Sequence, residues 1–290
     1  MRSQLLASLL FCVVGIQSCA VSKPMAPRGE TLWMESFDGL ALAYDDRDTV
    51  ESNTTLLFIH GLCCERGFWA EQAERFSGEY RVITVDLAGH GESGVDRSSW
   101  TLPDMTRDVV ALVRGLDLSR VIFVGHSMGG PVAIMAAAEL PNRIEAVVAV
   151  DALHDPELRI ALETFQPYLD AMALDYAKFW AQSVEGTFLP DADQAVMNRV
   201  LATANATPLE VAAGLMTSFP EFDLARTLAL CPVPVRCINS AMSPTKLEAA
   251  QAVARDFDAI ILEDVGHFLM LEAPDRFERS LRQTLQQLLN

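Results

Sequence analysis

The chain has 290 residues, enough for one large core or for a core with an inserted subdomain, and half of its residues are hydrophobic. It carries 22 Lys and Arg against 39 Asp and Glu, a formal net charge of −17 at pH 7. Such a charge repels nucleic-acid phosphates and anionic membrane surfaces, so we expect no nucleic-acid partner. No set of residues has the spacing of metal ligands, and we expect neither a metal nor a cofactor.

The N-terminus is predicted to be an export signal. Residues 1–16 combine one early positive charge with an apolar run of about a dozen residues, which is too short to span a bilayer. The following Ile16-Gln-Ser-Cys19 resembles the bacterial lipobox, in which the cysteine is lipidated and becomes the mature N-terminus. We therefore expect residues 1–18 to be a signal peptide, Cys19 to carry a lipid that anchors the protein at the cell envelope, and residues 19–30 to be a tether. The alternatives are ordinary cleavage after Ala20, with secretion, and an uncleaved anchor.

Two strands, 32–37 and 40–44, are expected first, joined by a turn at Asp38-Gly39. Short runs rich in β-branched residues then alternate with helical stretches, and their near-continuous hydrophobicity predicts a parallel sheet buried on both faces. The expected strands are 55–60, 80–85, 120–124, 144–150, 233–238 and 259–262. The crossovers that a parallel sheet requires are expected to include helices at 105–116, 131–140 and 244–256.

The alternation is interrupted from His154 to about Leu224, where large apolar residues recur at helical spacings without a convincing strand. We interpret residues 154–224 as a helical cap, and residues 31–153 with 225–290 as the core that carries it. Together the apolar residues of this segment would form an apolar roof, although each of them alone is more often plain helix packing. Four cysteines follow the signal, and we expect no structural disulfide among them: Cys63, Cys64, Cys231 and Cys237.

The most informative motif is Gly125-His-Ser-Met-Gly129, a Gly-x-Ser-x-Gly pattern between an expected strand and an expected helix. In that context the serine sits on a strained turn that lifts its hydroxyl clear of the sheet, and the flanking glycines remove side chains that would collide. The following helix directs its free N–H groups at the same point, and the N–H of Met128 can donate to an oxyanion. We therefore predict that Ser127 is a nucleophile.

The sequence resembles the α/β-hydrolase superfamily, in particular its branch with a helical cap after the sixth strand. The resemblance covers roughly residues 32–288 and depends on several motifs in order: His60-Gly61, Asp86-Leu-Ala-Gly-His-Gly-Glu-Ser93, Gly125 to Gly129, and Val265-Gly-His267 with Leu271-Glu-Ala-Pro-Asp275. It implies a mostly parallel, eight-stranded α/β sheet flanked by helices. It also implies that Leu62 supplies the second oxyanion-hole N–H and that His267 is the general base.

The residues themselves favour the same histidine. A serine hydroxyl is a poor nucleophile unless a neighbouring base accepts its proton, and the chain offers five histidines. His60 and His90 belong to Gly-flanked turns, His126 lies within the strained motif and His154 begins the cap. His267 follows the last expected strand, in the Ser…His order of this fold.

The third member of a catalytic triad is less clear, because the segment after the seventh strand, where the superfamily usually has a carboxylate, has no acid before Glu248. Asp151 ends the sixth expected strand and is our candidate, since some members of the branch that the sequence resembles carry the acid there. Asp155 and Asp264 are the rivals, and the acid could also be missing.

A Ser-His pair with an oxyanion hole suits acyl transfer through a tetrahedral intermediate, so we expect hydrolysis of a small to medium, apolar carboxylic ester. Lactone, thioester or carbon–carbon bond hydrolysis and cofactor-free peracid formation stay open, because a fold alone does not select among them. An alternative of another class is a membrane-tethered binding protein that has lost its acid.

Overall fold

The computed structural model describes residues 30–290. The predicted signal peptide, Cys19 and all but the last residue of the predicted tether lie outside the described residues. Within residues 30–290, eight strands form one sheet in the order β1-β2-β4-β3-β5-β6-β7-β8. The strands are β1 (Leu32–Glu35), β2 (Ala41–Arg47), β3 (Thr55–Ile59), β4 (Arg81–Val85), β5 (Val121–His126), β6 (Ile144–Val150), β7 (Val235–Ser240) and β8 (Phe257–Leu262).

The sheet is mostly parallel, as the long hydrophobic runs predicted. β1 pairs with β2 and β2 with β4 in antiparallel fashion, whereas the five remaining pairs are all parallel. The turn between β1 and β2 is made possible by Gly39, whose φ of +86° lies in the left-handed region that favours glycine.

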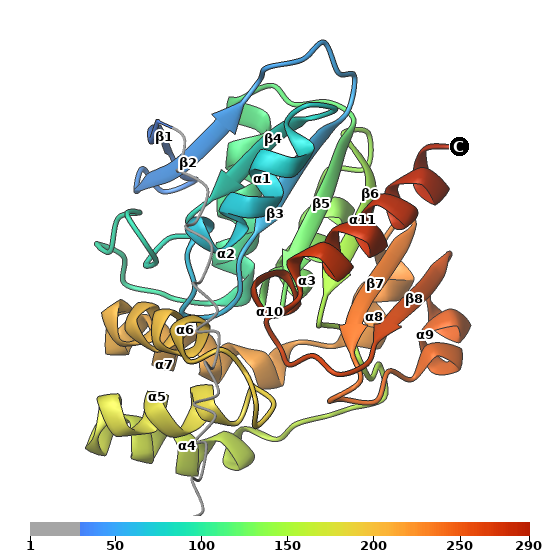
Figure 1. Ribbon diagram of the computed structural model, residues 1–290. Coiled ribbons are helices and arrows are strands. Elements are labelled where there is room, and N and C mark those ends of the chain that lie inside the picture. The colour runs from blue at the N-terminus through green and yellow to red at the C-terminus, as the bar shows by residue number, and fades with distance from the viewer. Residues whose placement is uncertain (1–29) are drawn as a thin grey trace, which may run out of the picture.

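Alternate residues of the central strands are buried under different helices on the two faces of the sheet (Figure 1). Leu57 and Ile59 of β3 belong to the core cluster shared with α2 (Leu102–Gly115), α3 (Gly129–Glu139), α8 (Leu224–Leu230) and α9 (Leu247–Val253). Leu56 and Phe58 belong to the cluster shared with α1 (Ala70–Phe76) and α11 (Pro274–Leu289). Burial on both faces explains why these strands read as continuous apolar runs.

Of the helices that lie between β6 and β7 in the chain, four cover the end of the sheet to which the parallel strands point (Figure 1). They are α4 (Leu162–Leu174), α5 (Tyr176–Glu185), α6 (Gln194–Ala206) and α7 (Leu209–Ser218). Asp175 and Asp193 begin α5 and α6, where their carboxylates accept hydrogen bonds from first-turn N–H groups. Among residues 30–290 we find no helix with the length and apolar character needed to cross a bilayer.

Element boundaries differ from the sequence prediction where prolines and caps intervene. β7 begins at Val235 instead of at residue 233, because Pro232 and Pro234 have no N–H to donate to a neighbouring strand. α2 begins at Leu102, three residues earlier than expected, since the Thr101 hydroxyl accepts a hydrogen bond from the N–H of Asp104.

Candidate active site

Ser127 occupies a sharp turn between β5 and α3. Its φ of +50° lies in the left-handed region, which costs energy for a residue with a Cβ atom. The turn is held by hydrogen bonds from the Ser127 N–H to the Val150 carbonyl (2.9 Å) and from the Gly130 N–H to the Ser127 carbonyl (2.9 Å). A Cβ atom at Gly125 would lie 2.2 Å from the Gly129 carbonyl oxygen, so the first position of the motif accepts only glycine.

The loop after β3 passes directly against this turn, because a Cβ atom on Gly61 would lie 3.0 Å from the Ser127 Cβ. Buried contacts hold the loop: the Arg66 N–H donates to Asp86 Oδ1 (2.6 Å), and the Arg66 guanidinium pairs with Asp45 and Asp86. Within residues 30–290, the N–H groups of the two predicted oxyanion donors, Leu62 and Met128, have no hydrogen-bond acceptor. Neither N–H is thus committed to a backbone acceptor, and both stay predicted oxyanion donors.

His267 and Asp151 are brought together at the same edge of the sheet. Asp151 follows β6 with a φ of +45°, and its Oδ2 accepts a 2.5 Å hydrogen bond from Nδ1 of His267. Its Oδ1 accepts a 2.7 Å bond from the Ser240 N–H at the end of β7. Burial opposes ionisation of Asp151, but these contacts, the one with His267 above all, outweigh it and lower the pKa of the carboxyl. Asp151 is thus a buried carboxylate that faces one side of the imidazole.

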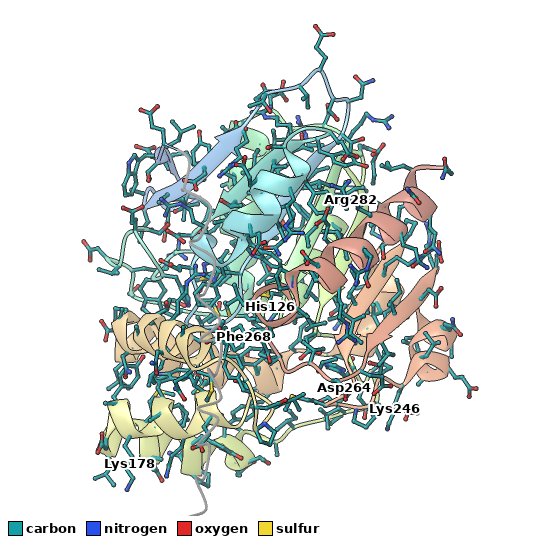
Figure 2. All side chains as sticks on the ribbon, in the orientation of Figure 1. His126, Lys178, Lys246, Asp264, Phe268 and Arg282 are labelled. Atoms are coloured by element: carbon teal, nitrogen blue, oxygen red, sulfur yellow. The ribbon has the colours of Figure 1, made fainter. Side chains whose placement is uncertain are left out.

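The two rival acids point elsewhere. Asp155 pairs with Lys246 at 2.9 Å, and Asp264 is exposed, although it lies only three residues before His267. Figure 2 shows Asp264 and Lys246 well apart from His126 and Phe268, which lie beside the candidate site. Neither rival carboxylate forms a hydrogen bond or ion pair with His267 in the described part of the chain.

The loop that carries His267 is held from three sides, a feature that we did not predict. Glu272 accepts hydrogen bonds from the N–H groups of Gly266 (3.1 Å) and Phe268 (2.9 Å), and the His267 N–H donates to the Thr187 carbonyl (2.8 Å). Nε2 of His126 lies 3.0 Å from the His267 carbonyl. Burial lowers the pKa of His126 to about 3, so its neutral ring donates there. The Leu271-Glu-Ala-Pro-Asp275 motif was the available signal for Glu272.

Ser127 and His267 line one cavity of about 170 Å³ between the sheet and the α4–α7 helices. For scale, an apolar cavity of ~150 Å³ accommodates benzene, so this space suits a group of about six non-hydrogen atoms. Within residues 30–290, Ser127 Oγ makes no hydrogen bond. The hydrogen bond between a catalytic serine and its base is often long in ligand-free enzymes. The walls are largely apolar and come from the loop after β3, from α5 and α6, and from the His267 loop: Leu62, Cys63, Cys64, Trp180, Val184, Val200, Ala204 and Phe268.

The four cysteines among residues 30–290 are buried with free thiols: Cys63, Cys64, Cys231 and Cys237. Burial raises the pKa of Cys63 to about 12, so this thiol is a poor nucleophile beside Ser127 at neutral pH. Among the described residues, no group of three or more His, Cys, Asp and Glu side chains could hold a metal ion.

Comparison with known proteins identifies the family. Residues 56–280 match the alpha/beta hydrolase family, and the chain therefore belongs to it. The chain is 40% identical over 105 residues to a Mycobacterium phage D29 protein with the provisional name non-heme haloperoxidase, and 38% identical over 97 residues to a Haemophilus influenzae protein with the provisional name esterase/lipase. These alignments cover 36% and 33% of this chain and only 38% and 33% of the two relatives.

The fold is also found in a thermophilic esterase from Thermogutta terrifontis, solved with malate bound. Its TM-score is 0.76, and the superposition covers 90% of this chain and 99% of that one. At 24% identity this likeness shows the fold alone.

Proposed function

We propose that the protein is a serine hydrolase that cleaves carboxylic esters through an acyl-enzyme on Ser127. The observation that carries the proposal is the 2.5 Å contact between the buried Asp151 and His267, which lines the same cavity as Ser127. The contact occupies Nδ1 and leaves Nε2 of the imidazole for the serine hydroxyl, which is the arrangement that acyl transfer requires.

The steps follow from these positions. His267 accepts the Ser127 proton on Nε2 while Oγ bonds to the ester carbonyl carbon, and the N–H groups of Leu62 and Met128 donate to the oxyanion that forms. The proton then passes to the leaving alcohol as the carbon–oxygen bond breaks. The same imidazole then deprotonates a water molecule that attacks the acyl carbon, and the imidazolium returns this proton to Ser127 Oγ as the acyl–Oγ bond breaks and the acid is released. Asp151 stabilises the imidazolium that forms in each half of the reaction.

The cavity supports a small to medium, apolar substrate. Space for about six non-hydrogen atoms fits a short acyl chain or a phenyl group, and the apolar wall offers few polar partners. Lactones and thioesters present the same carbonyl to Ser127, and carbon–carbon bond hydrolysis begins in the same way. Similarity to a protein provisionally named a haloperoxidase favours peracid formation as a second activity, with hydrogen peroxide in place of water.

A fluorophosphonate probe tests the proposal, because it labels only an activated serine. We expect labelling and turnover of p-nitrophenyl esters by the wild type, and neither by Ser127→Ala, with a loss on the order of 10³-fold or more. Thr187 lines the same cavity, so Thr187→Ala is a matched hydroxyl-removal control that should still be labelled. Turnover retained in Ser127→Ala would overturn the mechanism. A wild type that neither reacts nor turns over esters would favour the tethered binding protein.

We further propose that the enzyme is exported and lipid-anchored through Cys19 at the bacterial cell envelope, on the basis of the lipobox-like Ile16-Gln-Ser-Cys19. One acyl chain binds a membrane only marginally, whereas several chains at one terminus anchor firmly. Mass spectrometry of the mature N-terminus is the test. We expect a lipid-modified Cys19, and an unmodified chain that begins at Val21 would replace anchoring with secretion.

A further inference from the structure

A second histidine lies beside Asp151. His154 follows β6 by a few residues, and its Nε2 is 3.6 Å from Asp151 Oδ1. That distance exceeds a hydrogen bond, but the Asp151 carboxylate still acts electrostatically on the ring across it. The opposite ring atom, Nδ1, lies 3.2 Å from Oγ1 of Thr245, in the segment between β7 and α9. The ring therefore bridges Asp151 and the segment that follows β7.

The hydrogen positions around this ring are determined by a buried amide. Asn239 is fully buried, and the Ala152 N–H donates to its Oδ1 at 3.1 Å, which identifies the other amide atom as nitrogen. That nitrogen donates to the Ala152 carbonyl (3.1 Å) and to Thr245 Oγ1 (2.9 Å). Because Thr245 Oγ1 already accepts from Asn239, its own hydrogen is free to donate to Nδ1 of His154. The proton of the neutral ring is then on Nε2, the atom nearest Asp151 Oδ1, while the backbone of Asp151 and of Ser243 also faces the ring.

We propose that His154 is a positioning residue for Asp151: oriented by Thr245 and Asn239, it holds Oδ1 in place so that Oδ2 faces His267. The proposal deepens the proposed hydrolase function and depends on it. The Ser240 N–H and the His154 ring attract Oδ1 together, and rotation of the carboxylate away from His267 would break both contacts. The end of β7, where a carboxylate was expected, thus contributes the groups that position the acid of β6.

The charge of His154 adds a pH dependence to this role. Burial lowers its pKa, so at neutral pH the ring is uncharged and the negative charge of Asp151 is left to the His267 imidazolium. Protonation at lower pH would place a second cation beside Asp151. The charged groups that face or flank the ring are Asp151 at the end of β6, His267 after β8, and Asp155 with its ion-pair partner Lys246. Lys246 is shared between Asp155 (2.9 Å) and the exposed Glu157 (3.3 Å), and among these groups Asp151 and His267 act most directly on the ring.

The experiment compares His154→Phe, which keeps a planar ring without nitrogen, with His154→Gln, which retains an N–H donor, and with Thr245→Val, which removes only the orienting hydroxyl. Asp155→Asn is the nearby control. We expect kcat for p-nitrophenyl acetate to fall roughly three- to tenfold in His154→Phe with little change in KM, a partial return in His154→Gln, and no effect in Asp155→Asn. The acid limb of the kcat profile should become shallower in His154→Phe, because one titrating group is gone.

Two outcomes would overturn the proposal: kcat and the acid limb unchanged in His154→Phe, or equal losses in the Phe and Gln variants. If His154→Phe does not fold, Thr245→Val decides, and an unchanged acid limb there also refutes it. A wild type without esterase activity would refute the proposed function instead. In that case the downfield proton NMR signal of the His267–Asp151 hydrogen bond decides the positioning role without a substrate, and it should move in both His154→Phe and Thr245→Val.

Discussion

Asp151→Asn tests the candidate triad most directly, because the structure dictates how the new amide would sit. The Ser240 N–H donates to Oδ1 at 2.7 Å, so the amide oxygen must occupy that position. The amide nitrogen would then occupy the Oδ2 position, 2.5 Å from Nδ1 of His267 in the wild type. Since an NH₂ group can only donate, Nδ1 must become the acceptor and the imidazole proton moves to Nε2. His267 could then no longer accept the Ser127 proton.

The size of the effect follows from the buried pair. Removing one partner of a buried charged pair costs about 3–5 kcal/mol, here when the imidazolium forms in the transition state. At about 1.4 kcal/mol per tenfold change in rate, this corresponds to a loss of roughly 10²- to 10⁴-fold in kcat. Ester turnover at saturating p-nitrophenyl acetate measures the loss. Circular dichroism should show an intact fold, because the amide is close in shape to the carboxylate.

Asp155→Asn and Asp264→Asn are matched controls and should stay within about twofold of the wild type, since neither carboxylate contacts His267. If Asp151→Asn keeps near-normal kcat while Asp155→Asn loses it, the orienting acid is Asp155. If none of the three matters, the enzyme works as a Ser-His dyad.

Three further outcomes are expected. Trp180→Ala enlarges the 170 Å³ cavity, so kcat/KM for a longer acyl ester should rise about tenfold relative to kcat/KM for the acetate. If the preference across a series of acyl chain lengths is unchanged, the cavity is not the feature that selects the substrate. Glu272→Ala removes the two carboxylate oxygens that accept from Gly266 and Phe268 in the His267 loop and should lower kcat about tenfold or more, whereas Glu272→Gln keeps one acceptor and should lose less. Equal activities of the two variants would refute this role. Burial lowers the pKa of His60 to about 4 and those of His90 and His126 to about 3, so the folded protein keeps them neutral while the unfolded chain takes up protons below about pH 6.5. The free energy of unfolding should therefore fall as the pH drops from about 6.5 towards 4, by up to ~1.4 kcal/mol per pH unit for each histidine, and urea titrations that give equal stability across that range would exclude it.

Much of the architecture could be predicted from the sequence because it depends on local or periodic features. Continuous apolar runs such as 144–150 predicted strands buried on both faces, and β6 spans Ile144–Val150. The turn at Ser127 was predictable for a similar reason, since a strained strand-to-helix connection requires glycine at fixed positions within five residues. Its left-handed φ of +50° follows from that local chemistry. Boundaries were less predictable where a cap or a proline intervened, as at Thr101 and Pro234.

The contacts of the candidate site could not be predicted in the same way, because they join residues that are far apart in the chain. Asp151 and His267 are 116 positions apart, and they meet because β6 lies between β5 and β7 and ends at the same edge of the sheet. No local pattern distinguishes Asp151 from Asp155, since both follow the same strand. Only the pairing of β6 with β7, which sets the Ser240 N–H beside Asp151, selects one carboxylate over the other.

The sequence by itself therefore determined the strand pattern, the strained serine turn and the histidine that follows the last strand, because each is written in residues close together. The tertiary structure alone decided which carboxylate contacts His267, that Glu272, His126 and Thr187 hold the His267 loop, and how large the cavity is. Hydrogen-bond partners and cavity volume depend on distances of a few tenths of an ångström between separate elements, and only the packing of those elements against one another sets such distances.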